Sequence, residues 1–358
     1  MSKKKIIRNV ILVLAILILL LVLMFSIGDI KKIWNVLINT NGWFILLAFA
    51  FVILYAISYQ ASLMILTKYR FKNIAFKDLY YISGTEFFFN AITPFSSGGQ
   101  PFQAYALKRK GMNLSDSTSV LLINFIAYQI CLNVIAVVFM IMYYNRVHNQ
   151  IDSFIAFLIV GFAINTVIMV GLLLIGIVKP VGRIFLKLFD LICKIKFLRK
   201  FQHKHDEFEL YISNMQSAFR DISKSLSTWC LVILTKVLSF IFYYSIPLIA
   251  LYAIGINVMS NDYIYILALT AFTLTIAIWV PTPGGSGGVE YAFKELFSPY
   301  IEGYGFSQNE AFQMSLALML IWRLLTYYFL LIYGFVLYLL LERRTSKFEK
   351  MSINDLAE

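Results

Sequence analysis

The chain has 358 residues, of which 60% are hydrophobic and only 14% are charged. A water-soluble domain could not cover so much apolar surface, so this composition excludes an ordinary soluble protein and predicts an all-α polytopic integral membrane protein. The net charge of +12 would suggest nucleic-acid binding in a soluble protein. In a membrane protein, basic residues are instead expected in cytoplasmic loops that face anionic headgroups. We therefore expect membrane phospholipids as partners and no nucleic acid.

Polar chemistry typical of enzymes is sparse along the chain. Cys131, Cys193 and Cys230 lack the spacing of a metal site, and two of them lie in apolar runs, so we expect no disulfide framework. The three histidines sit in polar stretches. The sequence also lacks a nucleophile elbow, a P-loop and an HExxH motif. We predict no catalytic residue, no metal and no cofactor.

Long apolar runs predict about six full spans, because about 18 or more apolar residues cross the hydrocarbon core. These spans lie at 8–27, 43–66, 115–142, 153–178, 228–252 and 311–341. The first run also resembles a signal peptide, with Ser26-Ile27-Gly28 as a small-residue cleavage site. Its apolar core is longer than usual for such a peptide, so we favour an uncleaved first span.

Basic residues orient these spans. If the N-terminus is cytoplasmic, the inner segments hold 25 of the 31 Lys and Arg residues. These segments are 1–8, 68–77, 108–110, 179–227 and 342–350. By the positive-inside rule we predict a multi-pass protein of a bacterial-type cell membrane with both termini cytoplasmic.

Two inner segments have further predicted roles. Residues 179–227 interleave basic and apolar residues, which favours amphipathic helices on the inner leaflet over a solvated loop. Residues 342–358 form a cytoplasmic tail. Lys236, near the inner end of its span, is expected to extend its ammonium to the interface.

Two shorter apolar pieces each end in a cluster of prolines and glycines, which breaks a helix. Basic residues flank 78–107 on both sides, so this segment must enter and leave from the cytoplasm as a re-entrant hairpin. By the same reasoning, both ends of the segment 263–303 lie on the outer side, so it enters and leaves from the outer face. The tips share the pattern Thr-Pro-x-x-Ser-Gly-Gly, at 93–99 and again at 282–288.

The two tips are 189 residues apart, and the same offset places the span 43–66 near the span 228–252, which runs in the opposite direction. This arrangement indicates an inverted-topology repeat. We predict one membrane domain over 1–358. It consists of the first span 8–27, a first repeat 43–178, the cytoplasmic segment 179–227, a second repeat 228–341 and the tail.

Broken helices at membrane depth persist only where they line a polar cavity or are buried in protein. Half-helices that begin there present N–H groups with partial positive charge, which suits phosphate. Arg323, near the middle of the last span, would cost about 3 kcal/mol if unpaired. It therefore needs an anionic ligand or an acidic partner, Glu290 or Glu86. The alternatives are tips that only make tight turns and an arginine in a structural ion pair.

The predicted substrate-binding residues combine the two tips with these charged groups. They are Thr93, Pro94, Ser97, Gly98, Gly99, Gln100, Thr282, Pro283, Ser286, Gly287, Gly288, Glu290, Arg323 and Glu86. Four further polar residues are expected mainly to hydrogen-bond between helices. These are Asn90, Asn124, Gln60 and Gln129.

The run NAITPFSSGGQPFQAY at 90–105, the run PTPGGSGGVE at 281–290 and Arg323 together resemble the lysylphosphatidylglycerol synthase transmembrane-region family. The resemblance covers about residues 8–341. Long members join this region to a soluble aminoacyl-transferase domain. For them the resemblance implies transport of lysylphosphatidylglycerol and resistance to cationic antimicrobial peptides. Because the chain ends shortly after its last span, we expect the membrane region without the transferase domain.

The residues and the resemblance together predict a phospholipid flippase or scramblase for phosphatidylglycerol or lysylphosphatidylglycerol. Two alternatives are left open. One is a membrane-embedded lipid-modifying transferase, a phosphatidylglycerol lysyltransferase by family name. The other is a scaffold subunit that serves a separate lipid synthase. Close packing of small residues would also allow a homodimer.

Overall fold

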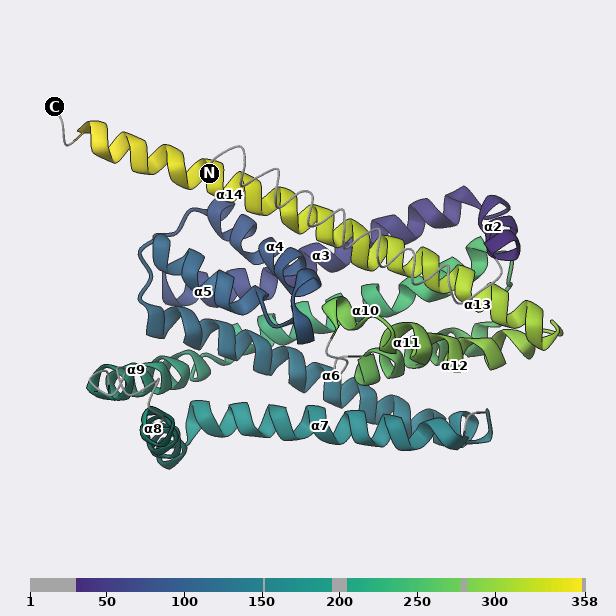
Figure 1. Ribbon diagram of the computed structural model, residues 1–358, viewed down its shortest axis with the longest axis horizontal. Helices are drawn as coiled ribbons and strands as arrows, with labels where there is room; N and C mark the ends of the chain where they lie inside the picture. The colour runs from purple at the N-terminus through teal and green to yellow at the C-terminus, as the bar shows by residue number, and fades with distance from the viewer. Residues whose placement is uncertain (1–29, 151, 195–204, 278–281, 356–358) are drawn as a thin grey trace.

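The protein is a bundle of helices of the predicted all-α polytopic membrane class. The computed structural model describes residues 30–150, 152–194, 205–277 and 282–355, and no strand occurs among them (Figure 1). Five helices in this part are long and apolar enough to cross a membrane, at Gly42–Arg70, Leu114–Asn149, Ile155–Ile177, Leu226–Ala253 and Gln308–Thr345. They confirm five of the predicted spans with slightly different limits. The predicted span 8–27 lies outside the described residues.

The helices follow one another with short connections. In chain order they are α2 (Ile30–Ile38), α3 (Gly42–Arg70), α4 (Phe76–Ile92), α5 (Gly99–Arg109), α6 (Leu114–Gln150), α7 (Asp152–Ile177), α8 (Lys179–Cys193), α9 (His205–Ser223), α10 (Leu226–Ala253), α11 (Tyr263–Ala277), α12 (Gly288–Glu302), α13 (Gln308–Arg323) and α14 (Phe329–Asp355). Short turns between them are η1 (Pro94–Ser96), η3 (Ser260–Asp262), η4 (Pro283–Gly285) and the π-helical η5 (Leu324–Tyr328). Side chains of Asn41, Ser225 and Ser307 accept hydrogen bonds from the first turns of α3, α10 and α13, which fixes where these helices begin.

Helices α3 and α10 pack against each other in opposite directions. The backbone N–H of Asn41, before α3, donates to the carbonyl of Ala253 at the end of α10 at 2.8 Å. Further along, Tyr55 and Tyr243 bring their ring centres within 4.7 Å. These are the two spans that the 189-residue offset relates, and their antiparallel packing is what an inverted repeat requires.

Each half of the chain contains a helical hairpin with a sharp turn at its tip. In the first hairpin α4 and α5 are joined through η1, and in the second α11 and α12 are joined through η4 (Figure 1). Phe95 (φ 53°, ψ 20°) and Gly284 (φ 61°, ψ 19°) occupy the same left-handed conformation in the two turns. Ser96 (φ 49°) and Gly285 (φ 66°) follow them. The two tips therefore share a left-handed turn of two residues, which in the first tip costs about 1–3 kcal/mol at each non-glycine residue.

Helix α14, from the second half, holds the first hairpin. A Cβ on Gly334 would lie 2.6 Å from the backbone N of Phe88. Only a residue without a side chain allows α14 to pass so close to α4. At the base of the hairpin, Asp78 forms ion pairs with Arg344 of α14 and with Lys110, which follows α5, at 2.5 and 3.3 Å.

A matching clamp lies at the base of the second hairpin. Arg146, near the end of α6, pairs with Asp262 of η3 at 2.6 Å, and the hydroxyl of Tyr300 in α12 donates to the same carboxylate at 3.3 Å. In both clamps, an arginine near the end of a long helix in one half binds an aspartate at the base of the hairpin in the other half. The two clamps lie at opposite ends of the long helices, because α6 and α14 run in opposite directions (Figure 1).

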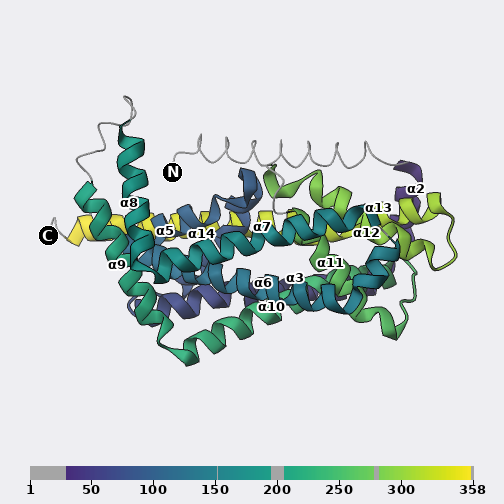
Figure 2. The same ribbon diagram turned by 90° about the horizontal axis from the view of Figure 1, so that it is seen from below.

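Residues 179–227, predicted to form amphipathic helices, contain α8 and α9. Both run across the direction of the long helices at one end of the molecule (Figure 2). Phe219 and Ile222 of α9 are buried, whereas Ile184 and Leu191 of α8 are 55% and 59% exposed. Such an exposed apolar face suits a helix that lies in the membrane interface.

Candidate functional site

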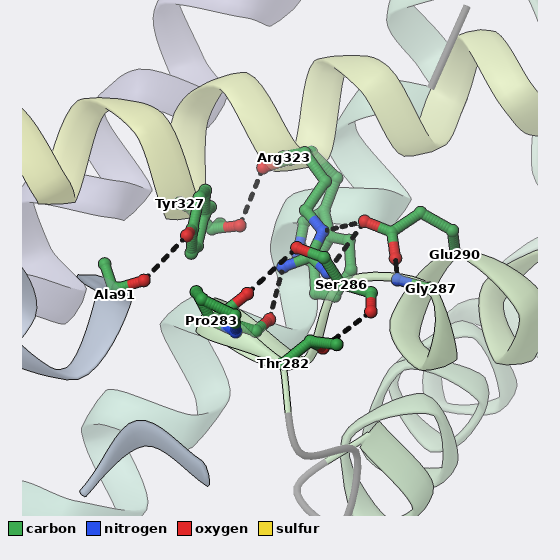
Figure 3. A network of polar contacts seen from close by, with 11 residues as sticks. Ala91, Thr282, Pro283, Ser286, Gly287, Glu290, Arg323 and Tyr327 are labelled. Atoms are coloured by element: carbon green, nitrogen blue, oxygen red, sulfur yellow. Dashed lines mark hydrogen bonds and ion pairs between the residues drawn. The ribbon is translucent and has the colours of Figure 1, made fainter. Parts of the chain in front are cut away.

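The two hairpin tips meet beside the π-helical turn η5. Turns η1 and η4 pack directly against each other. From η5, the hydroxyl of Tyr327 donates to the carbonyl of Ala91, at the end of α4, at 2.9 Å (Figure 3). The same ring lies so close to Gly284 that a Cβ there would overlap it. The turn at Gly284 thus requires glycine for space as well as for its positive φ.

Arg323 ties this junction together with one acidic side chain and one carbonyl. Its Nε donates to Oε1 of Glu290 at 2.9 Å, and its Nη1 donates to the carbonyl of Gly284 at 3.2 Å (Figure 3). Nη2 lies 2.8 Å from the same Oε1, but it makes no well-aligned hydrogen bond within the described residues. Arg323 and Glu290 are only 6% and 8% exposed. Of the two predicted partners, Arg323 therefore pairs with Glu290. Its Nη2 can still donate a hydrogen bond.

Glu290 also closes the N-terminus of α12. Its Oε2 accepts the backbone N–H of Gly287 at 2.6 Å. A helix N-terminus and a guanidinium both favour a negative charge, so the carboxylate occupies the position that an anion would prefer. The protein supplies its own anion at this junction.

The hydroxyl groups of the second tip bond within the tip. Thr282 Oγ1 donates to the carbonyl of Ser286 at 2.6 Å, and Ser286 Oγ donates to the carbonyl of Pro283 at 3.0 Å. Gly287 is exposed and Gly288 is half-buried. The second tip thus brings Thr282, Pro283, Ser286, Gly287 and Gly288 around the Arg323–Glu290 pair.

The first tip is more open. Thr93 Oγ1 accepts from the backbone N–H of Gly98 at 2.9 Å, and the N–H of Gly99 donates to Asn90 Oδ1 at 2.9 Å. Pro94 and Ser97 are exposed, and Gln100 is half-buried. This tip therefore offers polar groups to the surface beside the junction.

Glu86, the other predicted partner of Arg323, lies in a separate polar cluster. It accepts hydrogen bonds from the Tyr59 hydroxyl at 2.9 Å, from Asn90 at 3.4 Å and from Gln103 at 3.3 Å. The cation that acts on it electrostatically is Lys236. The structure thus divides the predicted charged residues between two buried centres.

The predicted position of Lys236 at the interface is wrong. The residue is 0% exposed, and its Nζ lies 4.1 Å from the centre of the Tyr59 ring. Lys236 points inward because α3 and α6 both pack against α10, and the ring of Tyr128 in α6 lies 5.9 Å from the ammonium. Position along the span suggested the interface, but cation–π contact inside the bundle replaces it.

Sequence reasoning missed the aromatic residues of both centres, Tyr59, Tyr128 and Tyr327. The i, i+4 spacing of Tyr55 and Tyr59 was a signal of one tyrosine-rich helix face. Of the residues predicted to bond between helices, Asn124 accepts from Ser62 at 2.7 Å and Gln60 donates to Tyr333 at 2.8 Å. Asn90 of α4 also bonds to another helix, since it accepts from the first residue of α5, and Gln129 is buried.

A cavity of about 400 Å³ lies between α12 and α13, at the end of α12 remote from Arg323. Its lining residues are Lys294, Glu295, Ser298, Pro299, Glu302, Gln308, Asn309 and Phe312.

The described residues contain no cluster of His, Cys, Asp and Glu that could hold a metal ion. At the tips, the guanidinium of Arg323 and the backbone N–H of Gly287 are donors of the kind that bind anions.

The buried pair generates a stability prediction. Glu290→Gln should lower the free energy of unfolding by about 3–5 kcal/mol, because Arg323 keeps its charge without a counter-charge. A Glu290→Leu, Arg323→Met double variant should regain most of this loss. Thermal unfolding in detergent measures both. Lys294→Ala is the control, because its pair with Glu295 is more exposed and worth at most about 1 kcal/mol. A double variant less stable than Glu290→Gln would contradict this account.

Comparison with known proteins places this geometry in a family. The profile of the family described as "Lysylphosphatidylglycerol synthase TM region" matches residues 10–334. The UPF0104 membrane protein MJ1595 of Methanocaldococcus jannaschii is 34% identical over 110 residues, which are 30% of this chain and 32% of that protein. The aligned part thus spans about a third of the length of that relative. Because the family profile covers most of the chain, the protein belongs to the lysylphosphatidylglycerol synthase TM region family.

Proposed function

We propose that the protein is a phospholipid flippase or scramblase that moves phosphatidylglycerol or lysylphosphatidylglycerol between leaflets. The observation that carries this proposal is the buried Arg323 at the meeting point of two hairpin tips. The family to which the chain belongs is associated with lipid handling, which supports a lipid as the ligand.

The phosphate of a lipid headgroup matches the chemistry of this junction. A guanidinium offers several N–H donors in a plane and binds phosphate oxygens in pairs. The Glu290 carboxylate already accepts hydrogen bonds from Arg323 and from the N–H of Gly287. A phosphate can replace this carboxylate with little change in charge around Arg323. The displaced Glu290 is then free to contact the amine of an aminoacylated headgroup.

The two clamps give a physical basis for alternating access. Asp78–Arg344 holds the base of the first hairpin, and Asp262–Arg146 holds the base of the second. They lie at opposite ends of the molecule, so opening one while the other stays closed would expose the junction to one side at a time (Figure 1). Transport in this scheme is movement of the two hairpins relative to the long helices.

Translocation of fluorescent phosphatidylglycerol and its lysylated form in proteoliposomes tests the proposal. Arg323→Ala should slow translocation about ten- to hundredfold, the cost of losing a hydrogen bond to a charged group. Arg70→Ala, which removes an ion pair with Asp116 away from the tips, is the matched control and should transport normally. Failure of folded wild-type protein to move either lipid would overturn the proposal. Turnover of lipid with an aminoacyl donor would instead support the transferase alternative.

The orientation in the cell membrane is a further part of the proposal. We infer that the end that carries α8, α9 and the Asp78 clamp faces the cytoplasm, because most of the basic residues in the described part of the chain belong to it, as the positive-inside rule expects (Figures 1 and 2). In a background with the native cysteines replaced by serine, an impermeant thiol reagent should label Asn261→Cys in intact cells. It should label Asn73→Cys only after the membrane is opened. The reverse pattern would contradict this orientation.

A further inference from the structure

A second buried charged centre lies on the first hairpin, apart from Arg323. Lys236 is 0% exposed and Glu86 is 5% exposed. The Lys236 Nζ has no hydrogen-bond partner among the residues that the structure describes, although it lies over the ring of Tyr59 at 4.1 Å. Charged groups at this depth are costly, about 3 kcal/mol each on insertion scales, and they usually mark a functional path. Helix packing alone does not need them.

Glu86 is surrounded by hydrogen-bond donors. Oε1 accepts from the Tyr59 hydroxyl at 2.9 Å and from Asn90 Nδ2 at 3.4 Å, and Oε2 accepts from Gln103 Nε2 at 3.3 Å. Each of these groups donates, so the arrangement suits a carboxylate without a proton. The hairpin is therefore built around the charged form of Glu86.

This carboxylate supports the tip directly. Asn90, which donates to Glu86, accepts the backbone N–H of Gly99 at 2.9 Å, and Gly99 is the first residue of α5. A Cβ on Gly99 would lie 2.6 Å from the Glu86 Cγ and 2.6 Å from Asn90 Oδ1. The second leg of the hairpin thus begins in contact with Glu86, and its N-terminal N–H groups favour a negative charge there.

We propose that Glu86, which contacts the same tyrosine, Tyr59, as Lys236, is a proton-binding site that controls the first hairpin. A proton on Oε2 would face Gln103 Nε2, a donor whose orientation is fixed by the carbonyls of Ile82 and Ser83 at 3.3 and 3.1 Å. A proton on Oε1 would face Asn90 Nδ2, whose orientation is fixed by Gly99. Because two donors cannot bond to each other, a proton on Oε2 weakens the Glu86–Gln103 contact, which joins α4 to α5, whereas a proton on Oε1 weakens the Glu86–Asn90 contact within α4. If the Gln103 amide rotates by half a turn, its Oε1, buried without a partner in the described residues, receives the new O–H, and Nε2 gives up the carbonyls of Ile82 and Ser83 in α4.

The groups that face Glu86 come from four helices. They are Tyr55 and Tyr59 of α3, Gln103 of α5, Tyr128 of α6 and Lys236 of α10. Tyrosines ordinarily stay neutral below about pH 10. Glu86 and Lys236 are therefore the charged members of this centre. The proton adds to Glu86 without any bond to carbon changing, so no further reactant is needed.

Infrared difference spectroscopy of the reconstituted protein tests proton binding without reference to lipid transport. On acidification, wild-type protein should gain a protonated-carboxyl C=O band that is missing in Glu86→Gln. Glu342→Gln, which removes a half-buried carboxylate that pairs with Arg109, is the matched control and should keep this band. Lys236→Met should move the pH midpoint of the band, because its charge acts on Glu86. A wild-type spectrum identical to that of Glu86→Gln overturns the proposal.

The link between the proton and transport rests on the proposed lipid translocation, and a second assay separates the two. The wild-type rate should change with pH, by up to about tenfold per pH unit for a single proton, whereas Glu86→Gln should be insensitive. If the protein shows the protonated-carboxyl band of Glu86 but moves no lipid, Glu86 binds a proton and the proposed function is rejected. A wild-type rate that is constant with pH would overturn the control of transport by Glu86.

Discussion

The structure depends on the ion pair that stabilises the charge of Arg323 inside the helix bundle. Arg323 lies where α13 passes into a π-helical turn, and its guanidinium binds the Glu290 carboxylate and the carbonyl of Gly284. Neither partner would be in place without the second tip, which turns sharply at Gly284 and begins α12 at Gly288. The charge, the broken helix and the first tip, joined through Tyr327, therefore form one unit. Removing any member leaves a buried polar group without its partner.

The two halves of the chain are connected reciprocally. Each hairpin is held at its base by an arginine of the other half, Arg344 for the first and Arg146 for the second. The tips share a left-handed turn, with Phe95 and Gly284 in the same conformation. Their charged centres differ, because Glu86 accepts from Tyr59, whose ring lies under Lys236, whereas Glu290 pairs directly with an arginine. The two tips thus share a left-handed turn but carry different charged groups, and the two proposals, phosphate at one and a proton at the other, rest on this difference.

Much of the fold could be predicted from the sequence because the bilayer imposes simple constraints. Five spans follow from length and hydropathy, and the repeated Thr-Pro-x-x-Ser-Gly-Gly predicted two tips that prove to have the same turn. The sequence narrowed the partner of Arg323 to two glutamates but could not choose, because that choice depends on which hairpin faces α13. Lys236 was misplaced because its depth depends on the helices that pack around it. The π-helical turn that directs Tyr327 to the first tip leaves no pattern in the 3.6-residue periodicity.

The central claim is that a phospholipid headgroup binds where the two tips meet. The most direct measurement uses phosphatidylglycerol with a photoreactive headgroup, irradiated with the reconstituted protein and mapped by mass spectrometry. The account predicts adducts within residues 93–100 and 282–290, and their loss in Arg323→Ala. Adducts confined to the outer surface of α7, unchanged in the variant, would contradict it.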